Sequence, residues 1–197
     1  NDIIKLAAAR ELVNGIKINT DKKILEDFQK SAGFDYTKDQ KRSIREIFAD
    51  LSSGRVMDRL LSGDVGFGKT EVAMNAMLAV ILDGYQAIFV CPTTLLATQH
   101  YHSMQKRFSE FGISIAKLDG KTPAKEKTHI KKGLESGEIK LVIGTHSLLE
   151  IKTNNLALVI IDEEHKFGVK QKEKLKHLRE DVHIFSMSAT PIPRTLN

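Results

Sequence analysis

Residues 60–74 read LLSGDVGFGKTEVAM and place several glycines, a lysine and a threonine directly after an apolar run. The stretch matches the pattern G-x-x-x-x-G-K-[ST] through Gly63, Gly68, Lys69 and Thr70, with Gly66 inside it. In such a loop the backbone N–H groups surround nucleotide phosphates, the lysine reaches the β- and γ-phosphate oxygens, and the threonine hydroxyl holds Mg²⁺. The stretch therefore predicts a phosphate-binding loop.

The sequence on either side of the loop favours this interpretation over a glycine turn that binds nothing. Residues 56–62 predict a strand that enters the loop. A helical pattern leaves it, with one wide apolar face that includes Val72, Ala76 and Val80. Glycine between a strand and a helix lets the backbone approach an anion at the helix N-terminus, which is the context that a phosphate loop requires. A dinucleotide fingerprint is excluded because Glu71 stands where its third glycine belongs.

From residue 56 onward, short β-rich runs alternate with helical patterns. The expected strands are 56–62, 87–91, 113–118, 141–144, 158–162 and 184–188. Most of these runs are apolar on both faces, as the strands of a parallel sheet covered by helices must be. The alternation predicts βαβ units, and therefore an α/β fold with a mostly parallel sheet flanked by helices.

A second part of the predicted site is LVIIDEEH, residues 158–165. It reads as an apolar strand that ends in Asp162 and Glu163, and open α/β sheets place their sites at the carboxyl ends of strands. At such a strand end we expect Asp162 to bind Mg²⁺ through a water molecule, alongside the Thr70 hydroxyl, and Glu163 to orient or deprotonate the attacking water. Acidic residues that merely end a strand are the alternative. Lys69, Asp162 and Glu163 are the expected catalytic residues.

The composition is that of a globular protein. A chain of 197 residues with 41% hydrophobic content can bury a substantial core. No apolar run approaches the roughly 18 residues that a membrane span needs, so we expect no membrane partner. Cys91 is the only cysteine, which excludes a disulfide within the chain and predicts a reducing, cytoplasmic compartment. The net charge of +5 permits a polyanionic partner without requiring one.

Residues 1–33 predict a helical extension in front of the main lobe, residues 34–197. Two helical stretches, 3–13 and 21–32, lie on either side of Asn14 and Gly15. A start at Asn1 without an initiator methionine suggests a fragment of a longer protein. Farther along, KTPAKEKTHIKK (121–132) predicts a helix from about Pro123, whose lysines form either a solvated face or a DNA contact.

The chain resembles the superfamily 2 helicases and translocases in the order of several motifs, since DEEH follows the phosphate loop as their motif II does. The other matching segments are VCPTTLLATQH (90–100), GTHSLL (144–149) and SAT (188–190), which resemble motifs Ia, Ib and III. SATPIPRTL and DEEHKFGVKQKEKLK look like the branch shared by the transcription-repair coupling factors and the RecG fork helicases. Within that branch, Phe67, Glu71 and Glu164 favour the coupling factors.

This resemblance implies a RecA-like P-loop lobe that binds ATP and Mg²⁺, with a nucleotide-sensing role for His165. FDYTKDQ, residues 34–40, resembles the family's Q motif, in which Phe34 and Gln40 read adenine. Thr37 and Gln40 also match a capping box at the start of the next helix. The two interpretations of Gln40 are compatible, because a cap does not use the whole amide.

By the same resemblance, contacts to the backbone of double-stranded DNA are expected in three loops. The candidates are Thr93, Thr94, Gly120, Lys121, Thr145 and His146. Hydroxyls, loop N–H groups and a cation suit phosphates, and they predict sequence-independent, salt-sensitive binding. Helix capping is the alternative role for each threonine.

The resemblance further implies an ATP-driven translocase on double-stranded DNA that displaces stalled RNA polymerase and recruits excision-repair proteins. It implies a second RecA-like lobe with an arginine finger, which this sequence does not contain. We therefore expect weak nucleotide binding and poor hydrolysis by this lobe alone. The alternatives are a RecG-like fork helicase, a P-loop kinase or other metabolic ATPase, and a non-catalytic interaction module.

Overall fold

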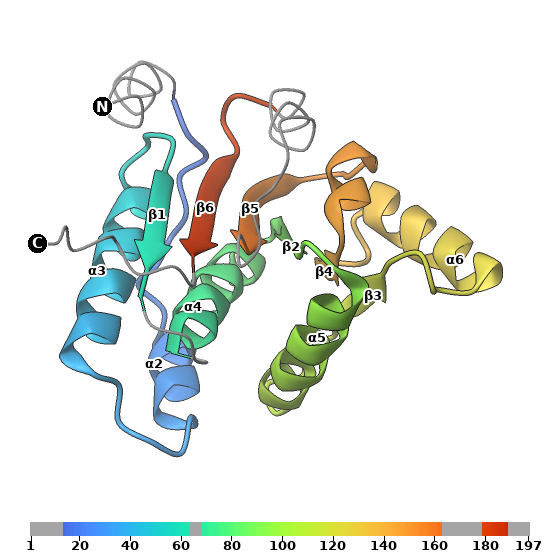
Figure 1. The fold of residues 1–197 in the computed structure, drawn as a ribbon. Helices are drawn as coiled ribbons and strands as arrows, with labels where there is room; N and C mark the ends of the chain where they lie inside the picture. The colour runs from blue at the N-terminus through green and yellow to red at the C-terminus, as the bar shows by residue number, and fades with distance from the viewer. Residues whose placement is uncertain (1–13, 64–67, 163–178, 189–197) are drawn as a thin grey trace, which may run out of the picture.

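A six-stranded parallel sheet forms the centre of the structure, a computed structural model that describes residues 14–63, 68–162 and 179–188. The strands are β1 (Asp58–Ser62), β2 (Gln86–Val90), β3 (Ala116–Leu118), β4 (Leu141–Gly144), β5 (Leu156–Asp162) and β6 (His183–Ser188). They lie in the order β1-β6-β5-β2-β4-β3, and each pair of neighbours is parallel (Figure 1). The predicted α/β fold with a parallel sheet is confirmed.

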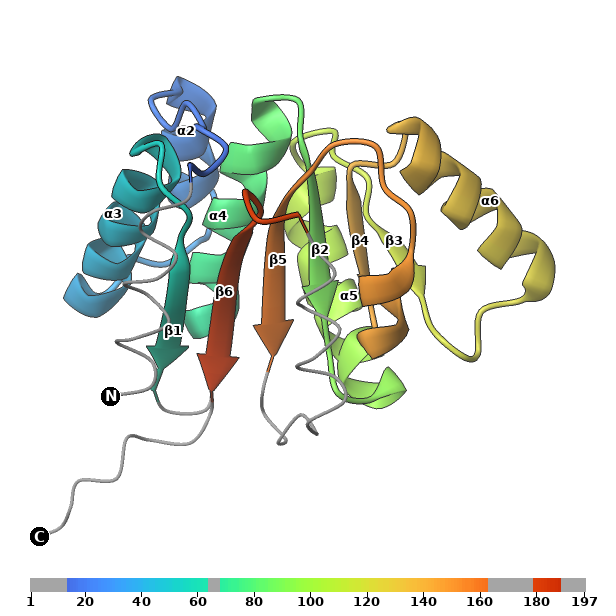
Figure 2. The ribbon, with the colours of Figure 1, turned by 90° about the horizontal axis from the view of Figure 1, so that it is seen from above.

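Helices cover both faces of the sheet. They are α2 (Lys23–Lys30), α3 (Lys38–Ser52), α4 (Gly68–Leu82), α5 (Thr94–Ser109), α6 (Ala124–Ser136) and the 3-10 helix η1 (His146–Glu150). Successive strand residues point to opposite faces. Phe89 of β2 joins the core formed with α2, α3, α4 and α5, whereas its neighbour Ile88 joins a smaller core with α6 and η1. Figure 2 shows the arrowheads of β1, β6 and β5 at one common edge.

The helix that follows the predicted phosphate-binding loop, α4, is buried on all sides. Every residue from Thr70 to Val80 is buried. The sheet covers one side of α4, and α2 and α3 cover another. The prediction of a single apolar face through Val72, Ala76 and Val80 is therefore too narrow. A helix that is apolar nearly all round is typical of a fully enclosed position.

Residues 14–32 pack against the lobe that follows them. Ile18 and Phe28 are fully buried in the core that contains α4. The Phe28 ring stacks on Phe108 of α5, with 5.6 Å between the ring centroids. The helix expected at 21–32 is present as α2, and the one expected at 3–13 lies outside the described residues. The domain boundary at residue 33 stays a prediction.

A buried histidine ties this N-terminal segment to the sheet. The Met57 N–H donates to Nδ1 of His183 at 2.9 Å. Nε2 of His183 therefore carries the proton and donates to the Ile16 carbonyl oxygen at 2.6 Å. The imidazole of His183, at the start of β6, thus links the chain at residue 16 to the residue that precedes β1.

The predicted strands differ from the observed ones mainly at their first residues. The largest difference is at 113–118, where β3 begins only at Ala116. The Ile113 N–H bonds back to the Phe108 carbonyl oxygen and closes the end of α5, so it is not available to the sheet. Of the helices in the described ranges, none is both long and apolar enough to cross a membrane.

Candidate functional site

Lys69 lies where the ends of β1 and β6 meet. Its Nζ donates hydrogen bonds to the carbonyl oxygens of Gly63, directly after β1, and of Ser188, the last residue of β6, at 3.0 and 2.9 Å. α4 begins at Gly68, so its unpaired N–H groups lie at the same edge, where they favour an anion. Gly66 belongs to residues 64–67, which lie outside the described residues.

Asp162 is the last residue of β5, the strand next to β6. Asp162 and Thr70 are both buried, at 4% and 5% exposure. A carboxylate and a hydroxyl supply the oxygen ligands that Mg²⁺ prefers, so the chemistry of these two residues fits the ion that the prediction assigns to them. Glu163 and His165 lie outside the described residues, and their roles stay predictions.

His100 of α5 is a partner of Asp162 that the sequence motifs did not predict. Its Nε2 lies 2.8 Å from Oδ2 of Asp162. An ionised carboxylate only accepts, so the imidazole N–H is the donor. The ring also packs against Phe89, with 5.2 Å between ring centroids. His100 was visible only as the last letter of VCPTTLLATQH, and a single histidine in a helix gives no sign of its partner.

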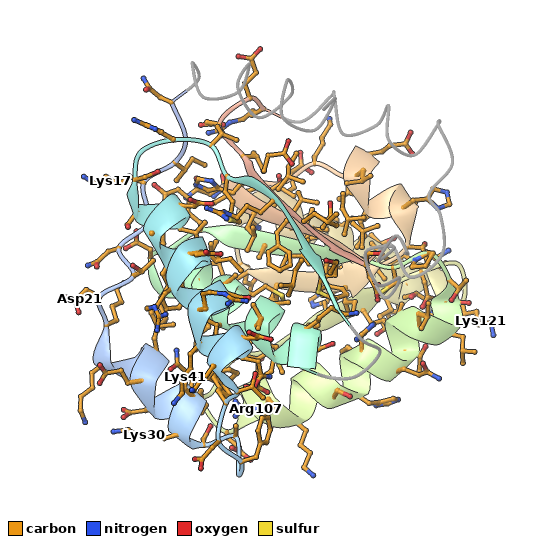
Figure 3. The ribbon with its side chains drawn as sticks, turned by 60° about the vertical axis from the view of Figure 1, so that its left-hand side comes forward. Lys17, Asp21, Lys30, Lys41, Arg107 and Lys121 are labelled. Carbon is orange, nitrogen blue, oxygen red and sulfur yellow. The ribbon has the colours of Figure 1, made fainter. Side chains whose placement is uncertain are left out.

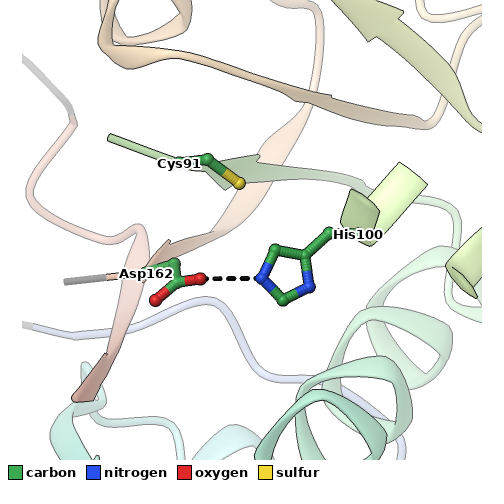
Figure 4. A group of neighbouring side chains, drawn as sticks. All are labelled: Cys91, His100 and Asp162. Carbon is green, nitrogen blue, oxygen red and sulfur yellow. Dashed lines mark hydrogen bonds and ion pairs between the residues drawn. The ribbon is translucent and has the colours of Figure 1, made fainter. Parts of the chain in front are cut away.

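Cys91, directly after β2, lies beside this pair (Figure 4). The metal-binding atoms of Cys91, His100 and Asp162 all lie within 4.8 Å of one another. Thiolate and imidazole are ligands that Zn²⁺ prefers, at roughly 2.0–2.3 Å. The cluster therefore places ligands for a soft metal beside the aspartate that is predicted to hold Mg²⁺.

Thr37 and Gln40 form the expected capping box at the start of α3. The Thr37 N–H donates to Gln40 Oε1 at 2.8 Å, and the Gln40 N–H donates to Thr37 Oγ1 at 3.1 Å. Gln40 Nε2 also donates to the Gly68 carbonyl oxygen at 3.2 Å. Among the described residues, these bonds use one N–H of the Gln40 side-chain amide and one lone pair of its Oε1. One N–H and one lone pair therefore remain for a base.

Gly68 lies next to Gln40, and Phe34 is the other residue expected to contact the base. A Cβ at position 68 would lie 3.4 Å from Gln40 Nε2, so glycine there allows the close approach of α4 to the capping box. The Phe34 side chain is 45% exposed, and its ring is tilted against Tyr36 with 5.8 Å between centroids. An exposed aromatic ring suits the predicted contact with adenine, which stays a prediction.

Glu71 follows Thr70 in the first turn of α4 and holds a buried carboxylate. Arg107 of α5 contacts both oxygens, with Nε 3.2 Å from Oε1 and Nη2 2.5 Å from Oε2. The Tyr36 hydroxyl donates to Oε2 at 2.5 Å. Burial raises the pKa of Tyr36, and the hydrogen bond to Glu71 raises it further. Burial lowers the pKa of Arg107, but its bond to Glu71 and the charge of Glu71 outweigh burial, so the net shift is upward.

Arg107, labelled in Figure 3, also contacts the end of α2. Its guanidinium lies over the Phe28 ring, 3.9 Å from the centroid, and donates to the Phe28 carbonyl oxygen at 2.9 Å and to Ser31 Oγ at 2.6 Å. Asn75 of α4 extends the network by donating to the Tyr36 hydroxyl at 3.2 Å. Glu71, which favoured one family branch in the sequence, thus has a packing role that the sequence did not reveal.

The candidate DNA contacts follow the carboxyl ends of the other three strands. Thr93 and Thr94 follow β2, Gly120 and Lys121 follow β3, and Thr145 and His146 follow β4. These strands are neighbours in the order β2-β4-β3, whereas Gly63, Ser188 and Asp162 belong to β1, β6 and β5 or their ends. The edge therefore has a candidate nucleotide half, at β1, β6 and β5, and a candidate DNA half, at β2, β4 and β3.

Asp119 builds the loop that contains Gly120 and Lys121. Its Oδ1 accepts the Lys121 N–H at 2.8 Å, and its Oδ2 accepts from Lys117 Nζ at 3.2 Å. Its own N–H donates to Thr122 Oγ1 at 3.0 Å. Burial raises the pKa of Asp119, but the bonds from Lys121 and Lys117 outweigh burial and lower it overall. Lys121 itself is exposed.

Thr93 caps α5, because its Oγ1 accepts the Leu96 N–H at 3.2 Å. The capping alternative therefore holds for this threonine. Thr93 is also exposed, so its hydroxyl proton can still reach a phosphate oxygen. The contact of Thr93 with DNA stays a prediction.

Known sequences include a matching family model and several similar proteins. The family model described as DEAD/DEAH box helicase matches residues 37–197. A transcription-repair-coupling factor of Helicobacter pylori (strain J99) is 56% identical over 195 residues, which cover 99% of this chain and 20% of that protein. That of Bacillus subtilis (strain 168) is 45% identical over 199 residues, 100% of this chain and 17% of that protein. The chain thus spans about a fifth of the length of these relatives.

Solved structures show the same architecture. RecG bound to a three-way DNA junction matches 99% of this chain and 26% of its own, with a TM-score of 0.85 and 43% sequence identity. The helicase MrfA bound to DNA and AMPPNP matches 96% of this chain and 30% of its own, with a TM-score of 0.66. At 18% identity this second likeness shows the fold alone. The RecA-like lobe architecture is confirmed.

Proposed function

Because the chain belongs to the DEAD/DEAH box helicase family, we propose that it is the ATP-binding lobe of a motor that moves along double-stranded DNA. In the whole protein the motor displaces stalled RNA polymerase and couples transcription to nucleotide excision repair. The similarity to transcription-repair-coupling factors along nearly the whole chain supports this role.

The main support from the structure is the division of the sheet's carboxyl edge. Lys69 bridges the ends of β1 and β6, and Asp162 ends β5 beside them. The loops of β2, β4 and β3 add hydroxyls, N–H groups and an exposed lysine on the other half. One edge thus offers a site for a nucleotide and its metal next to a surface suited to a second polyanion.

Within the proposed site, Lys69 reaches the β- and γ-phosphate oxygens. Thr70 would hold Mg²⁺ through its hydroxyl, Asp162 would hold it through a water molecule, and Glu163 would orient the attacking water. Bound Mg²⁺ supplies neutralisation of the charge that develops during phosphoryl transfer. The burial of Thr70 and Asp162 keeps bulk water away from the two ligands.

The remaining residues of the site recognise the rest of the nucleotide. Phe34 and Gln40 hold the adenine, and His165 responds to the phosphates. The backbone at Gly63, Gly66 and Gly68 surrounds the phosphate chain. A second RecA-like lobe completes the site with an arginine finger, so full activity requires the longer protein.

A RecG-like fork helicase is the second candidate, because the RecG structure shares 43% identity over almost the whole chain. The identity to the Helicobacter pylori coupling factor over the same extent is higher, at 56%. The two candidates predict different substrates for the same motor lobe. One acts on a transcribing polymerase and the other on branched DNA.

The test uses the full-length protein and its ATPase rate with and without double-stranded DNA. We expect DNA to stimulate hydrolysis, and Lys69→Ala to lower the stimulated rate by about 10²-fold or more, since a charge that stabilises the transition state is removed. Lys23→Ala, which changes an exposed lysine of α2, is the matched control and should leave the rate unchanged. An unchanged rate in Lys69→Ala would exclude the proposed site.

The same protein then distinguishes the two motors. Release of a stalled RNA polymerase from DNA, lost in Lys69→Ala, supports the coupling factor. Remodelling of a synthetic three-way junction with no effect on the polymerase supports the fork helicase.

A further inference from the structure

Helix α5 connects the two halves of the carboxyl edge. It begins directly after the β2 loop of the candidate DNA half, where Thr93 caps it. Its residue His100 donates to Asp162 at the end of β5, in the candidate nucleotide half. β2 and β5 are hydrogen-bonded neighbours at the centre of the sheet. One helix therefore extends from the loop expected to contact DNA to the aspartate expected to hold Mg²⁺.

The His100–Asp162 contact is built into the core. The two side chains are only 18% and 6% exposed, and the ring is held against Phe89. Ala97 and Met104, on the same face of α5, are fully buried and keep the helix against the sheet. Removing a hydrogen-bond donor from a buried carboxylate costs free energy of folding. Asp162 therefore favours orientations in which its Oδ2 accepts the His100 N–H.

A second contact of α5 reaches the residue next to Thr70, the other Mg²⁺ candidate. Arg107 lies seven positions after His100, two helical turns along the same face. Its Nη2 is 2.5 Å from the carboxylate of Glu71, the residue after Thr70. α5 thus contacts Asp162 directly through His100, and the turn that contains Thr70 through Arg107.

We propose that His100 is a positioning residue that couples DNA contact at the start of α5 to the orientation of the Asp162 carboxylate. The inference rests on the proposed function. DNA bound at Thr93 and Thr94 fixes the position of α5, and α5 fixes the imidazole that holds the carboxylate. A helix shift of about 1–2 Å is typical of such transitions. It is enough to stretch a 2.8 Å hydrogen bond beyond its useful range.

Coupling of this kind is reciprocal. If DNA improves the binding of Mg²⁺ and nucleotide through His100, then Mg²⁺ and nucleotide must improve the binding of DNA by the same factor. Both directions can be measured as equilibrium affinities, independently of turnover. A residue that serves only the packing of α5 would not change this factor while the protein stays folded.

The experiment compares His100→Ala and His100→Gln in the full-length protein, with His102→Ala as the control. His102 is an exposed histidine of the same helix. The first measurement is the half-saturating Mg²⁺ concentration for the binding of AMPPNP, with and without double-stranded DNA. The second is the Kd for DNA with and without Mg²⁺ and AMPPNP. Melting temperatures report whether each variant is folded.

For His100→Ala we expect the half-saturating Mg²⁺ concentration with DNA to rise about 10-fold or more, the usual effect of losing a partner of a metal ligand. The factor by which nucleotide tightens DNA binding should fall toward one. His100→Gln, whose amide N–H has a similar reach, should keep the half-saturating Mg²⁺ concentration and the coupling factor close to their wild-type values. His102→Ala should match the wild type.

Two results would overturn the inference. One is a His100→Ala variant with wild-type Mg²⁺ dependence and coupling factor. The other is an equal loss in His100→Ala and His100→Gln accompanied by an equal fall in melting temperature, which would assign His100 to packing. If the wild-type protein shows no DNA-stimulated ATPase at all, the proposed function fails instead, so the two failures are distinguishable.

Discussion

Glu71 and Arg107 form a two-point ion pair between the first turn of α4 and the last turn of α5, with N···O distances of 2.5 and 3.2 Å. Their side chains are only 6% and 14% exposed. The pair lies next to Thr70 and is covered by Phe28 of α2. The start of α4 is therefore held in place by charge as well as by apolar packing.

Removal of one member of this pair should be strongly destabilising. Arg107→Met leaves the Glu71 carboxylate buried without its cation, so we expect the free energy of unfolding to fall by about 3–5 kcal/mol. Glu71→Gln combined with Arg107→Met removes both charges and keeps an acceptor for Tyr36, so the double variant should be more stable than Arg107→Met alone. Urea unfolding of the 197-residue chain measures both differences.

Arg42→Met is the matched control for Arg107→Met. Arg42 pairs with Asp39 on the surface, where the side chains are 61% and 82% exposed. Such pairs contribute about 0–1 kcal/mol, so this variant should unfold near the wild-type urea concentration. A double variant no more stable than Arg107→Met would show that the charge of Glu71 is not the reason for the loss.

The sequence predicts local features of this fold better than the partners of its side chains. The strand at 141–144 is an apolar run closed by Gly144, and β4 has those same bounds. The contacts of α5 depend instead on strand order. His100 is 62 positions from Asp162, and Arg107 is 36 positions from Glu71. Only the placement of β2 beside β5 brings His100 to its partner, and no local pattern encodes that placement.

The burial of α4 has a similar origin. Its apolar residues predict a helix, but the number of its enclosed faces depends on α2 and α3, which precede the phosphate loop in sequence. Glu71 and Asn75 are polar and would mark a solvated face in an isolated helix. In the fold they meet Arg107 and Tyr36, so the helix is enclosed on that side too.

The loop that contains Gly120 and Lys121 should loosen in acid through Asp119. The pKa of Asp119 is lowered from its ordinary value of 3.8. A carboxyl whose pKa is lower in the folded state stabilises the fold above its unfolded pKa, and this contribution is lost as the pH falls through the folded pKa. We therefore expect the contribution of Asp119 to be complete near pH 6 and to decline below about pH 4.

Asp119→Asn isolates this contribution from general acid unfolding. Asparagine keeps an oxygen for the Lys121 N–H but has no charge for Lys117. The wild type should melt at a higher temperature than Asp119→Asn near pH 6, and the difference should shrink toward pH 3. A difference that is constant across this range would show that the charge of Asp119 does not stabilise the loop.

Zn²⁺ should inhibit the ATPase of the full-length protein by competing for Asp162. Cys91 and His100 have metal-binding atoms within 4.8 Å of the Asp162 carboxylate, and this mixed set favours Zn²⁺ over Mg²⁺. Cys91→Ser removes the soft ligand with little change in volume, so the half-inhibiting Zn²⁺ concentration should rise. Cobalt binding, followed by the absorption of a cobalt–thiolate bond, reports the site independently of turnover. Equal sensitivity of wild type and Cys91→Ser would rule the cluster out as the inhibitory site.

Gln40 should have two separable roles, in the cap of α3 and in the choice of base. Its Oε1 accepts the Thr37 N–H at 2.8 Å, and its Nε2 donates to Gly68 at 3.2 Å. Gln40→Ala removes both roles. Gln40→Glu keeps the acceptor of the cap but removes the N–H donors, so it should lower the affinity for ATP more than it lowers stability. We expect a loss of about 2- to 12-fold in ATP affinity and a reduced preference for ATP over GTP, because one hydrogen bond to the base contributes roughly 0.5–1.5 kcal/mol.

Thr37→Ala separates the cap from the base. It removes the hydroxyl that accepts the Gln40 N–H at 3.1 Å, at a cost of about 1 kcal/mol in stability, and leaves the glutamine amide in place. If Gln40 recognises adenine, Thr37→Ala should keep the preference for ATP over GTP. Gln40→Glu should lose that preference. Competition between labelled ATP and GTP, measured on the full-length protein below its melting temperature, gives this ratio directly. If Thr37→Ala loses the preference as fully as Gln40→Glu, the capping box positions Gly68 and the phosphate loop, and Gln40 does not read the base.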